Sequence, residues 1–216
     1  MSDLLDCTDP ATRPLAITAA ARAVSTGSLV VLPTDTLYGI GADAFNSAAV
    51  TSLLAAKGRG RDMPVPVLVG SWHTIDGLVS AVTGAARDLI EAFWPGALTL
   101  VVEHAPSLAW DLGDARGTVA VRMPLHPVAL ELLAETGPMA VSSANVTSMP
   151  PAVTAQQAYE QLGESVSVYL DGGEAPAGRP STIVDLTGPE PVLLRAGAVS
   201  VDRLREVIGG FDGEAG

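Results

Sequence analysis

Residues 29–41 read LVVLPTDTLYGIG, and this stretch decides the fold that we expect for the chain. The run Leu29-Val30-Val31-Leu32 is apolar throughout, which is typical of a strand buried on both faces of a sheet. The segment from Pro33 to Gly41 is dense in hydroxyl groups and glycine, so we expect a loop there. The stretch therefore predicts a buried strand that delivers a polar loop to the edge of a sheet.

Outward from this stretch, short apolar runs alternate with helical patterns. Residues 15–25 form an alanine-rich helix that ends near Gly27, and Asn46 is the N-cap of a helix that runs to about residue 56. Residues 64–69 alternate prolines with apolar residues and are interpreted as an edge strand. Further helices are predicted from Thr83 and near 127–135, 154–162 and 201–208, and further strands near 97–103, 118–122, 139–141, 166–170, 181–186 and 191–195. Both short and helical connections indicate an α/β protein with a sheet of mixed direction.

Composition limits the class of protein. The chain has 216 residues, 48% of them hydrophobic, and a mean hydropathy of +0.34, which favours one compact domain. No apolar run is long enough to span a bilayer, and the acidic N-terminus lacks the basic region of a signal peptide. A single cysteine, Cys7, excludes an internal disulfide. We therefore expect a cytoplasmic protein, and its net charge of −12 disfavours strong binding of nucleic acid.

A small cationic segment stands out against this acidic background. Lys57-Gly58-Arg59-Gly60-Arg61-Asp62 contains the only lysine in the chain and two arginines. Lysine and arginine suit phosphate oxygens, and glycine lets the backbone approach a ligand. The alternative is an ordinary helix C-terminus, where basic residues complement the helix dipole and glycine ends the helix. That alternative explains Lys57-Gly58 but not the arginines that follow.

Three polar loops each follow the end of a strand or helix: 33–41, 57–62 and 142–145. Loops of this kind gather where open α/β sheets bind ligands, so together they would surround a polyanion. The chain lacks GxxxxGK[ST], and Gly39-Ile40-Gly41 lacks the third glycine of a dinucleotide fingerprint. The residues alone therefore indicate a small-molecule enzyme with an anionic substrate.

Seven sequence blocks, in order, resemble one family. Pro33 to Gly41 is similar to the motif P-T-[DE]-T-x-Y-G-[LI]-G of the YrdC/TsaC family, the threonylcarbamoyl-AMP synthases. The other blocks are Lys57-x-Arg59, Phe93-Trp94-Pro95-Gly96 followed by Leu98-Thr99, Val119 to Pro124, Ser143-Ala144-Asn145, Ser181-Thr182-Ile183 and Leu193-Leu194-Arg195-x-Gly197. The resemblance implies a twisted open sheet of mixed parallel and antiparallel strands, flanked by helices, with a concave ligand cleft. It also implies one catalytic domain over 15–208, between tails at 1–14 and 209–216.

The resemblance implies a nucleotidyltransferase. Members combine L-threonine, bicarbonate or CO2, and ATP into threonylcarbamoyl-AMP and pyrophosphate. Partner proteins of the t6A pathway then transfer the product to position 37 of tRNA. Mg²⁺ is expected to arrive with ATP, without a dedicated protein site.

Site residues follow from the matching positions. The resemblance implies that Lys57, Arg59, Ser143 and Asn145 are catalytic and bind ATP, and that Arg195 is a further ATP contact. It implies that Thr36, Arg122 and Ser181 bind threonine. Taken alone, each of these residues has a plainer interpretation as a cap, a turn or a surface charge.

Some positions depart from the family pattern. Met63-Pro64-Val65 stands where many relatives have N-P-[LI], and Leu68 stands where relatives often have a polar side chain. Arg61 is a candidate for a compensating ATP contact. Ser142 replaces a proline, a change that we expect to be mild.

Two other functions remain open at this stage. The first is a module that binds double-stranded RNA or tRNA without turnover of its own, since YrdC-like domains present a concave basic surface. Even for the enzyme, weak or indirect contact with RNA is compatible with the sequence. The second is the related carbamoyl-adenylate chemistry of hydrogenase-maturation carbamoyltransferases, whose chains are longer and carry zinc-finger and acylphosphatase-like parts.

Overall fold

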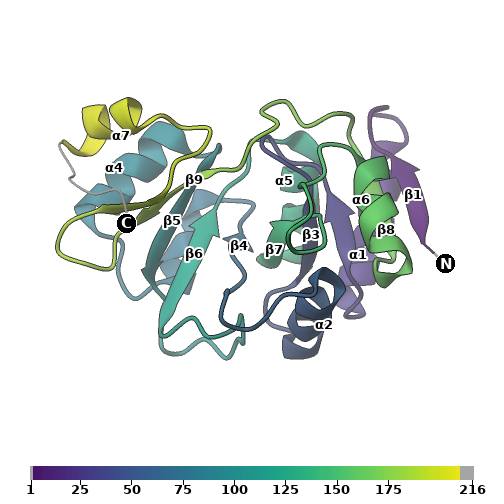
Figure 1. Cartoon of the computed structure of the whole chain (residues 1–216), viewed down its shortest axis with the longest axis horizontal. Helices are drawn as coiled ribbons and strands as arrows, with labels where there is room; N and C mark the ends of the chain where they lie inside the picture. The colour runs from purple at the N-terminus through teal and green to yellow at the C-terminus, as the bar shows by residue number, and fades with distance from the viewer. Residues whose placement is uncertain (1, 210–216) are drawn as a thin grey trace.

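The computed structural model describes residues 2–209, in which ten strands join one sheet in the order β1-β8-β2-β3-β7-β4-β6-β5-β9-β10 (Figure 1). The strands are β1 (Asp3–Asp6), β2 (Val30–Leu32), β3 (Gly39–Asp43), β4 (Val67–Leu68), β5 (Leu98–Glu103), β6 (Thr118–Arg122), β7 (Met139–Ser143), β8 (Val168–Asp171), β9 (Thr182–Asp185) and β10 (Val192–Arg195). The helices are α1 (Arg13–Ser25), α2 (Ser47–Lys57), α3 (Ile75–Leu78), α4 (Gly84–Phe93), α5 (Pro127–Thr136), α6 (Ala155–Leu162) and α7 (Val201–Ile208), with 3-10 turns η1 (Trp72–Thr74) and η2 (Gly163–Ser165).

The sheet contains both parallel and antiparallel pairings. β1, β8 and β2 are parallel, β3 is antiparallel to both β2 and β7, and β4 is parallel to β6. This arrangement confirms the predicted α/β class with a mixed sheet. Among the described residues, no helix is long and apolar enough to cross a membrane.

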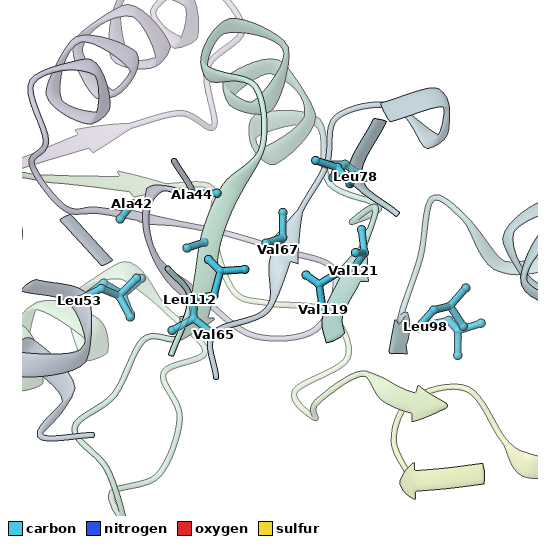
Figure 2. Packing of buried hydrophobic residues seen from close by; sticks show 14 of the residues in the cluster. Ala42, Ala44, Leu53, Val65, Val67, Leu78, Leu98, Leu112, Val119 and Val121 are labelled. Carbon is cyan, nitrogen blue, oxygen red and sulfur yellow. The ribbon is translucent and has the colours of Figure 1, made fainter. Parts of the chain in front are cut away.

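Buried side chains form one apolar layer on each face of the sheet. The smaller layer joins α1 and α5, through residues such as Ile17 and Leu132, to Leu32 and Met139 of the sheet. The larger layer runs from Leu53 of α2 across β3, β4 and β6 to Leu98 of β5, as Figure 2 shows. At the far end of the molecule, α4 and α7 lie side by side over β5 and β9 (Figure 1).

Short-range signals set the helix ends. The side chains of Asn46 and Thr83 accept hydrogen bonds from Ala49 N and Ala86 N, so both predicted N-caps are confirmed. Gly58 ends α2 in the left-handed conformation, with φ +60°, which a glycine adopts without a Cβ clash. The helix-end interpretation of Lys57-Gly58 is therefore correct, and Arg59 begins the segment that leaves the helix.

Two predictions about strands were wrong. The segment 64–69 is not an edge strand, because Val67 and Leu68 pair with both β6 and β7 at the centre of the sheet. The prolines are tolerated because the paired strand is only two residues long, and Pro64 and Pro66 lie ahead of it. Gly39 and Gly41 belong to β3 and not to a loop. Because glycine has no Cβ atom, Gly39 leaves room for the side chain of Val141 and Gly41 leaves room for that of Met139, both on the neighbouring strand β7.

The N-terminal residues also differ from expectation. Asp3–Asp6 form β1, which pairs in parallel with β8, where a tail over 1–14 was expected. The stretch DLLD is too short and too acidic to be recognised as a strand without its partner. The expected C-terminal tail, 209–216, lies outside the described residues except for Gly209.

Candidate functional site

A cavity of about 450 Å³ opens on the concave side of the sheet. Its walls come from the loop between β2 and β3, the ends of β7, β6 and β10, the beginnings of β5 and β9, and the segment after α2. Seven of the nine predicted site residues line it: Thr36, Arg59, Arg122, Ser143, Asn145, Ser181 and Arg195. The three loops expected to converge therefore do converge, together with strand beginnings that the prediction did not include.

A compact hydroxyl network holds the loop after β2. Thr34 Oγ1 accepts hydrogen bonds from the backbone N–H groups of Thr36 (3.2 Å) and Leu37 (3.3 Å) and donates to Leu37 O (2.6 Å). It also lies 3.0 Å from Thr36 Oγ1. Both threonines are buried. The sequence singled out Thr36 but not Thr34, whose hydroxyl fixes the turn on which Thr36 sits.

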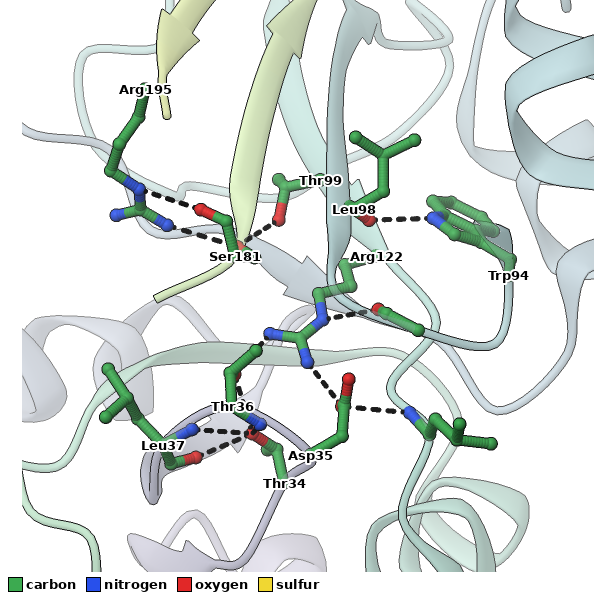
Figure 3. Close-up of polar contacts among 12 residues, drawn as sticks. Thr34, Asp35, Thr36, Leu37, Trp94, Leu98, Thr99, Arg122, Ser181 and Arg195 are labelled. Carbon is green, nitrogen blue, oxygen red and sulfur yellow. Dashed lines mark hydrogen bonds and ion pairs between the residues drawn. The ribbon is translucent and has the colours of Figure 1, made fainter. Parts of the chain in front are cut away.

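Arg122, the last residue of β6, is buried at the base of the cavity. Its Nε donates to Gly96 O (2.9 Å), and its Nη1 donates to Thr36 Oγ1 (2.8 Å). Its Nη2 donates to the carboxylate of Asp35, which the sequence prediction did not select (Figure 3). The predicted threonine-binding pair Arg122 and Thr36 is therefore in direct contact.

A second polar group lies above Arg122 in Figure 3. Arg195 Nε and Nη2 donate to Ser181 O (2.9 Å) and Ser181 Oγ (3.0 Å), and Thr99 Oγ1 lies 2.8 Å from Ser181 Oγ. A register shift between Leu193 and Arg195 places both Leu194 and Arg195 in the cavity wall. A bulge re-aims side chains in this way, and such a bulge cannot be read from the sequence.

Arg59 reaches the cavity from the segment after α2. Its Nε donates to Met63 O (2.9 Å), and its Nη1 donates to Ser142 Oγ (3.0 Å). The second contact depends on the serine that replaces the family's proline, because a proline offers no hydroxyl. Ser142 therefore adds a contact to Arg59, and the expectation that the replacement is mild stays a prediction. Leu68, the other noted departure, is buried and forms part of the cavity wall.

Lys57 lies just behind the cavity wall and is not part of the lining. Its Nζ donates to Ser143 O (2.5 Å), Asn145 O (2.7 Å) and Asn145 Oδ1 (3.3 Å). Burial, with a smaller effect from the charge of Arg59, lowers the pKa of Lys57 to about 8. The amine therefore holds the loop that carries Ser143 and Asn145, and its predicted contact with phosphate stays a prediction.

The two predicted residues of that loop differ in what their side chains do. Asn145 is buried, and its Nδ2 donates to Val146 O (2.9 Å) and Met149 O (2.8 Å). Ser143 Oγ makes no hydrogen bond to any described residue, and Ser143 lines the cavity. The hydroxyl of Ser143 is therefore available to a ligand, whereas the amide of Asn145 supports the loop.

Arg61 does not line the cavity. Its Nη2 and Nη1 donate to the two carboxylate oxygens of Asp111 (2.6 and 3.1 Å), and its Nε lies 3.5 Å from Asp114. The pair is exposed, with 49% of the Arg61 side chain accessible. Lys57 and Arg61 are the two predicted site residues outside the lining. Of these, only Arg61 would have to leave a carboxylate partner to reach a ligand.

The lining is cationic within an acidic protein. It contains three arginines, several hydroxyl groups and no aspartate or glutamate, whereas the whole chain carries a net charge of −12. Within residues 2–209, no group of three or more His, Cys, Asp or Glu side chains could hold a metal ion. Donors and cations of this kind suit an anionic ligand with several oxygen atoms.

Fold and cavity together define an α/β protein with a cationic cleft against a mixed sheet. The sequence model of the Sua5/YciO/YrdC family, described as telomere recombination, matches residues 22–197. The chain therefore belongs to the Sua5/YciO/YrdC family, and the predicted resemblance is confirmed.

Individual relatives cover most of the chain. A Mycobacterium tuberculosis (H37Rv) protein named "Putative threonylcarbamoyl-AMP synthase" is 64% identical over 97% of this chain and 96% of its own length. The threonylcarbamoyl-AMP synthase of Pyrococcus abyssi is 37% identical over 88% of this chain but only 56% of its own length. The crystal structure of P. abyssi Sua5 complexed with L-threonine superposes with a TM-score of 0.92 at 33% identity, over 99% of this chain and 62% of that one.

Proposed function

We propose that the chain is an L-threonylcarbamoyladenylate synthase, which joins L-threonine, bicarbonate or CO2, and ATP into threonylcarbamoyl-AMP and pyrophosphate. The observation that carries the proposal is the acid-free cavity, with three arginines and the free hydroxyl of Ser143, in a protein of net charge −12. The names of the relatives support the same activity, and the P. abyssi structure supports threonine as a ligand.

The proposed chemistry asks little covalent help from the protein. The threonine amine is carboxylated, and the carbamate oxygen then attacks the α-phosphate of ATP as pyrophosphate leaves. The reaction brings two anions together, so fixed cations that hold both and neutralise the leaving charge lower the barrier. Arg59 and Arg195, on different walls of the cavity, suit the phosphates, and the free hydroxyl of Ser143 suits a phosphate or carbamate oxygen.

We assign threonine to a second group of lining residues, around Arg122. Arg122 retains N–H groups that its three contacts do not use, and Thr36 and Ser181 line the cavity close to it. A buried guanidinium with unused donors suits a carboxylate. The assignment of Thr36, Arg122 and Ser181 to threonine is a proposal.

Lys57 and Asn145 enter the proposal chiefly through the loop they support. Because Lys57 Nζ contacts the backbone oxygens of Ser143 and Asn145, it fixes where the Ser143 hydroxyl points. A direct phosphate contact would require Nζ to leave these oxygens. Arg61 remains a candidate for an outer phosphate contact only if it exchanges Asp111 for the ligand.

Several further points belong to the proposal. Mg²⁺ would enter as part of the ATP substrate, bound to phosphate oxygens and water. The product would be passed to t6A-pathway proteins that modify tRNA. A cytoplasmic location fits those partners.

The direct test is pyrophosphate release by the purified protein, with and without L-threonine and bicarbonate. We expect release that requires both co-substrates and that falls at least about tenfold in Ser143→Ala. Glu131→Gln is the control, because it removes an ion pair with Arg13 between α1 and α5, outside the cavity lining. Release that ignores threonine would mean a different acceptor and would overturn the proposal.

A further inference from the structure

Asp35 is the one acidic side chain in the described part of the chain that bonds directly to an arginine of the cavity lining. Its Oδ1 accepts from Arg122 Nη2 and from the backbone N–H of Leu125 (2.9 Å). The two side chains are nearly buried, with 13% of Asp35 and 8% of Arg122 accessible. Asp35 itself does not line the cavity.

The pair connects parts of the sheet that are not neighbours. Asp35 follows β2, and Arg122 ends β6, with β3, β7 and β4 between these two strands in the sheet. The carboxylate and the guanidinium therefore join these separate parts of the sheet, and Figure 3 shows them facing each other. The bond to Leu125 N fixes the same carboxylate to the segment that follows Arg122.

Three fixed acceptors leave the guanidinium a single orientation. Gly96 O holds Nε, Thr36 Oγ1 holds Nη1 and the Asp35 carboxylate holds Nη2. The carboxylate is the only charged member of this set, and a charge-assisted bond is the strongest kind of the three. Without it, the long arginine side chain gains rotamer freedom, and the unused N–H groups no longer point at a fixed place.

We propose that Asp35 is a positioning residue, which acts through Arg122 by holding its guanidinium in the orientation that receives the substrate carboxylate. This inference rests on the proposed function, in which that carboxylate belongs to threonine. Asp35 is therefore expected to affect threonine use and not ATP use.

The test compares Asp35→Ser, Arg122→Met and the double variant, with Glu131→Gln as the control that removes another carboxylate–arginine pair. In Asp35→Ser we expect kcat/KM for threonine to fall about tenfold or more, with KM for ATP changed by less than about twofold. Formate is a small carboxylate that can accept from Arg122 Nη2 in place of the removed side chain, so it should restore part of the threonine activity, whereas chloride at equal ionic strength should not. The double variant should lose no more activity than Arg122→Met alone.

Three results would overturn the inference. Losses that multiply in the double variant would mean that Asp35 acts independently of Arg122. Equal losses for threonine and ATP, with no rescue by formate, would mean a role in stability alone. Asp35→Asn guards against an unfolded serine variant, because the amide oxygen can still accept from Nη2; it should retain threonine kcat/KM better than Asp35→Ser, and an equal loss in both would also count against orientation.

A failure of the proposed function can be distinguished from a failure of the inference about Asp35. If the wild-type protein shows no threonine-dependent turnover, the synthase proposal fails. The contact between Asp35 and Arg122 is then still tested by thermal unfolding. Formate should raise the unfolding temperature of Asp35→Ser but not that of the double variant or of Glu131→Gln.

Discussion

Lys57 shows how a residue can be recognised from the sequence and still have its contacts misjudged. Its place at the end of α2, beside two arginines, could be predicted from local patterns. The direction of its Nζ could not, because the acceptors in Ser143 and Asn145 are 86 and 88 residues away in the chain. Only the packing of α2 against β3, and the pairing of β3 with β7, bring them together.

The buried amine predicts a stability that depends on pH. The folded-state pKa of Lys57, about 8, lies below its ordinary value of 10.5, so the unfolded chain binds more protons between these pH values. The contribution of Lys57 to the free energy of unfolding should therefore rise with pH across this window, by at most about 3 kcal/mol. Urea unfolding of wild type and Lys57→Met at pH 7.5 and 10 measures it. A difference between the two proteins that stays constant with pH would contradict the prediction.

Ser143 and Asn145 should respond differently to truncation. Ser143→Ala removes a hydroxyl without a protein partner in the described structure, so the free energy of unfolding should change by less than about 0.5 kcal/mol while pyrophosphate release falls. Asn145→Ala removes the donor to Val146 O and Met149 O and an acceptor for Lys57, and should destabilise by about 1–3 kcal/mol. Urea unfolding and pyrophosphate release on both variants check this. Equal effects on stability would argue against the division of roles.

At the scale of the elements, periodicity and capping predicted most helices and strands of the chain to within a few residues. The predictions that failed depended on partners distant in the sequence. Val67 and Leu68 were assigned to an edge because prolines are excluded from long central strands, and they lie at the centre only because β4 is so short. Residues of the motif 33–41 line the cavity, but Gly39 to Gly41 belong to strand β3 and not to a loop.

Gly197, in the turn after β10, lies against the backbone of the lining residue Ser181. A Cβ at Gly197 would lie within 2.5 Å of Ser181 O and Thr182 N, which are backbone atoms that cannot move aside freely. Gly197→Ala should therefore displace Ser181, destabilise the protein by about 1–3 kcal/mol and raise KM for threonine. Gly77→Ala is the control, since nothing lies within 4 Å of a Cβ there, and it should leave both quantities unchanged or slightly raise stability. Unaltered unfolding and kinetics in Gly197→Ala would show that the turn accommodates the methyl group.

At the scale of the whole molecule, sequence reasoning could predict the class of fold and the identity of most lining residues. It could not predict the shape that makes them a site. Arg122 ends β6 and Asp35 follows β2, two strands that are not adjacent, so their contact depends on the complete sheet. The bulge that turns Arg195 inward likewise results from pairing with β9.

The charge of the whole molecule bears on the alternative of RNA binding. A net charge of −12 repels a polyanion, and the lining arginines lie inside a cavity suited to a small ligand. We therefore expect the Kd for tRNA to be weaker than about 1 µM at about 0.15 M salt, measured by filter binding. Tighter, salt-sensitive binding by a protein that shows no turnover would favour the RNA-binding module instead.

The burial of Lys57 also predicts that its amine reacts slowly with acylating reagents. Apart from the amine at the N-terminus, the chain offers them one primary amine, and that residue is 2% exposed. The amine can react only when the loop at 143–145 opens and exposes Nζ. The fraction of molecules modified at Lys57 over time, measured by intact mass, would therefore report how often this part of the cavity wall opens.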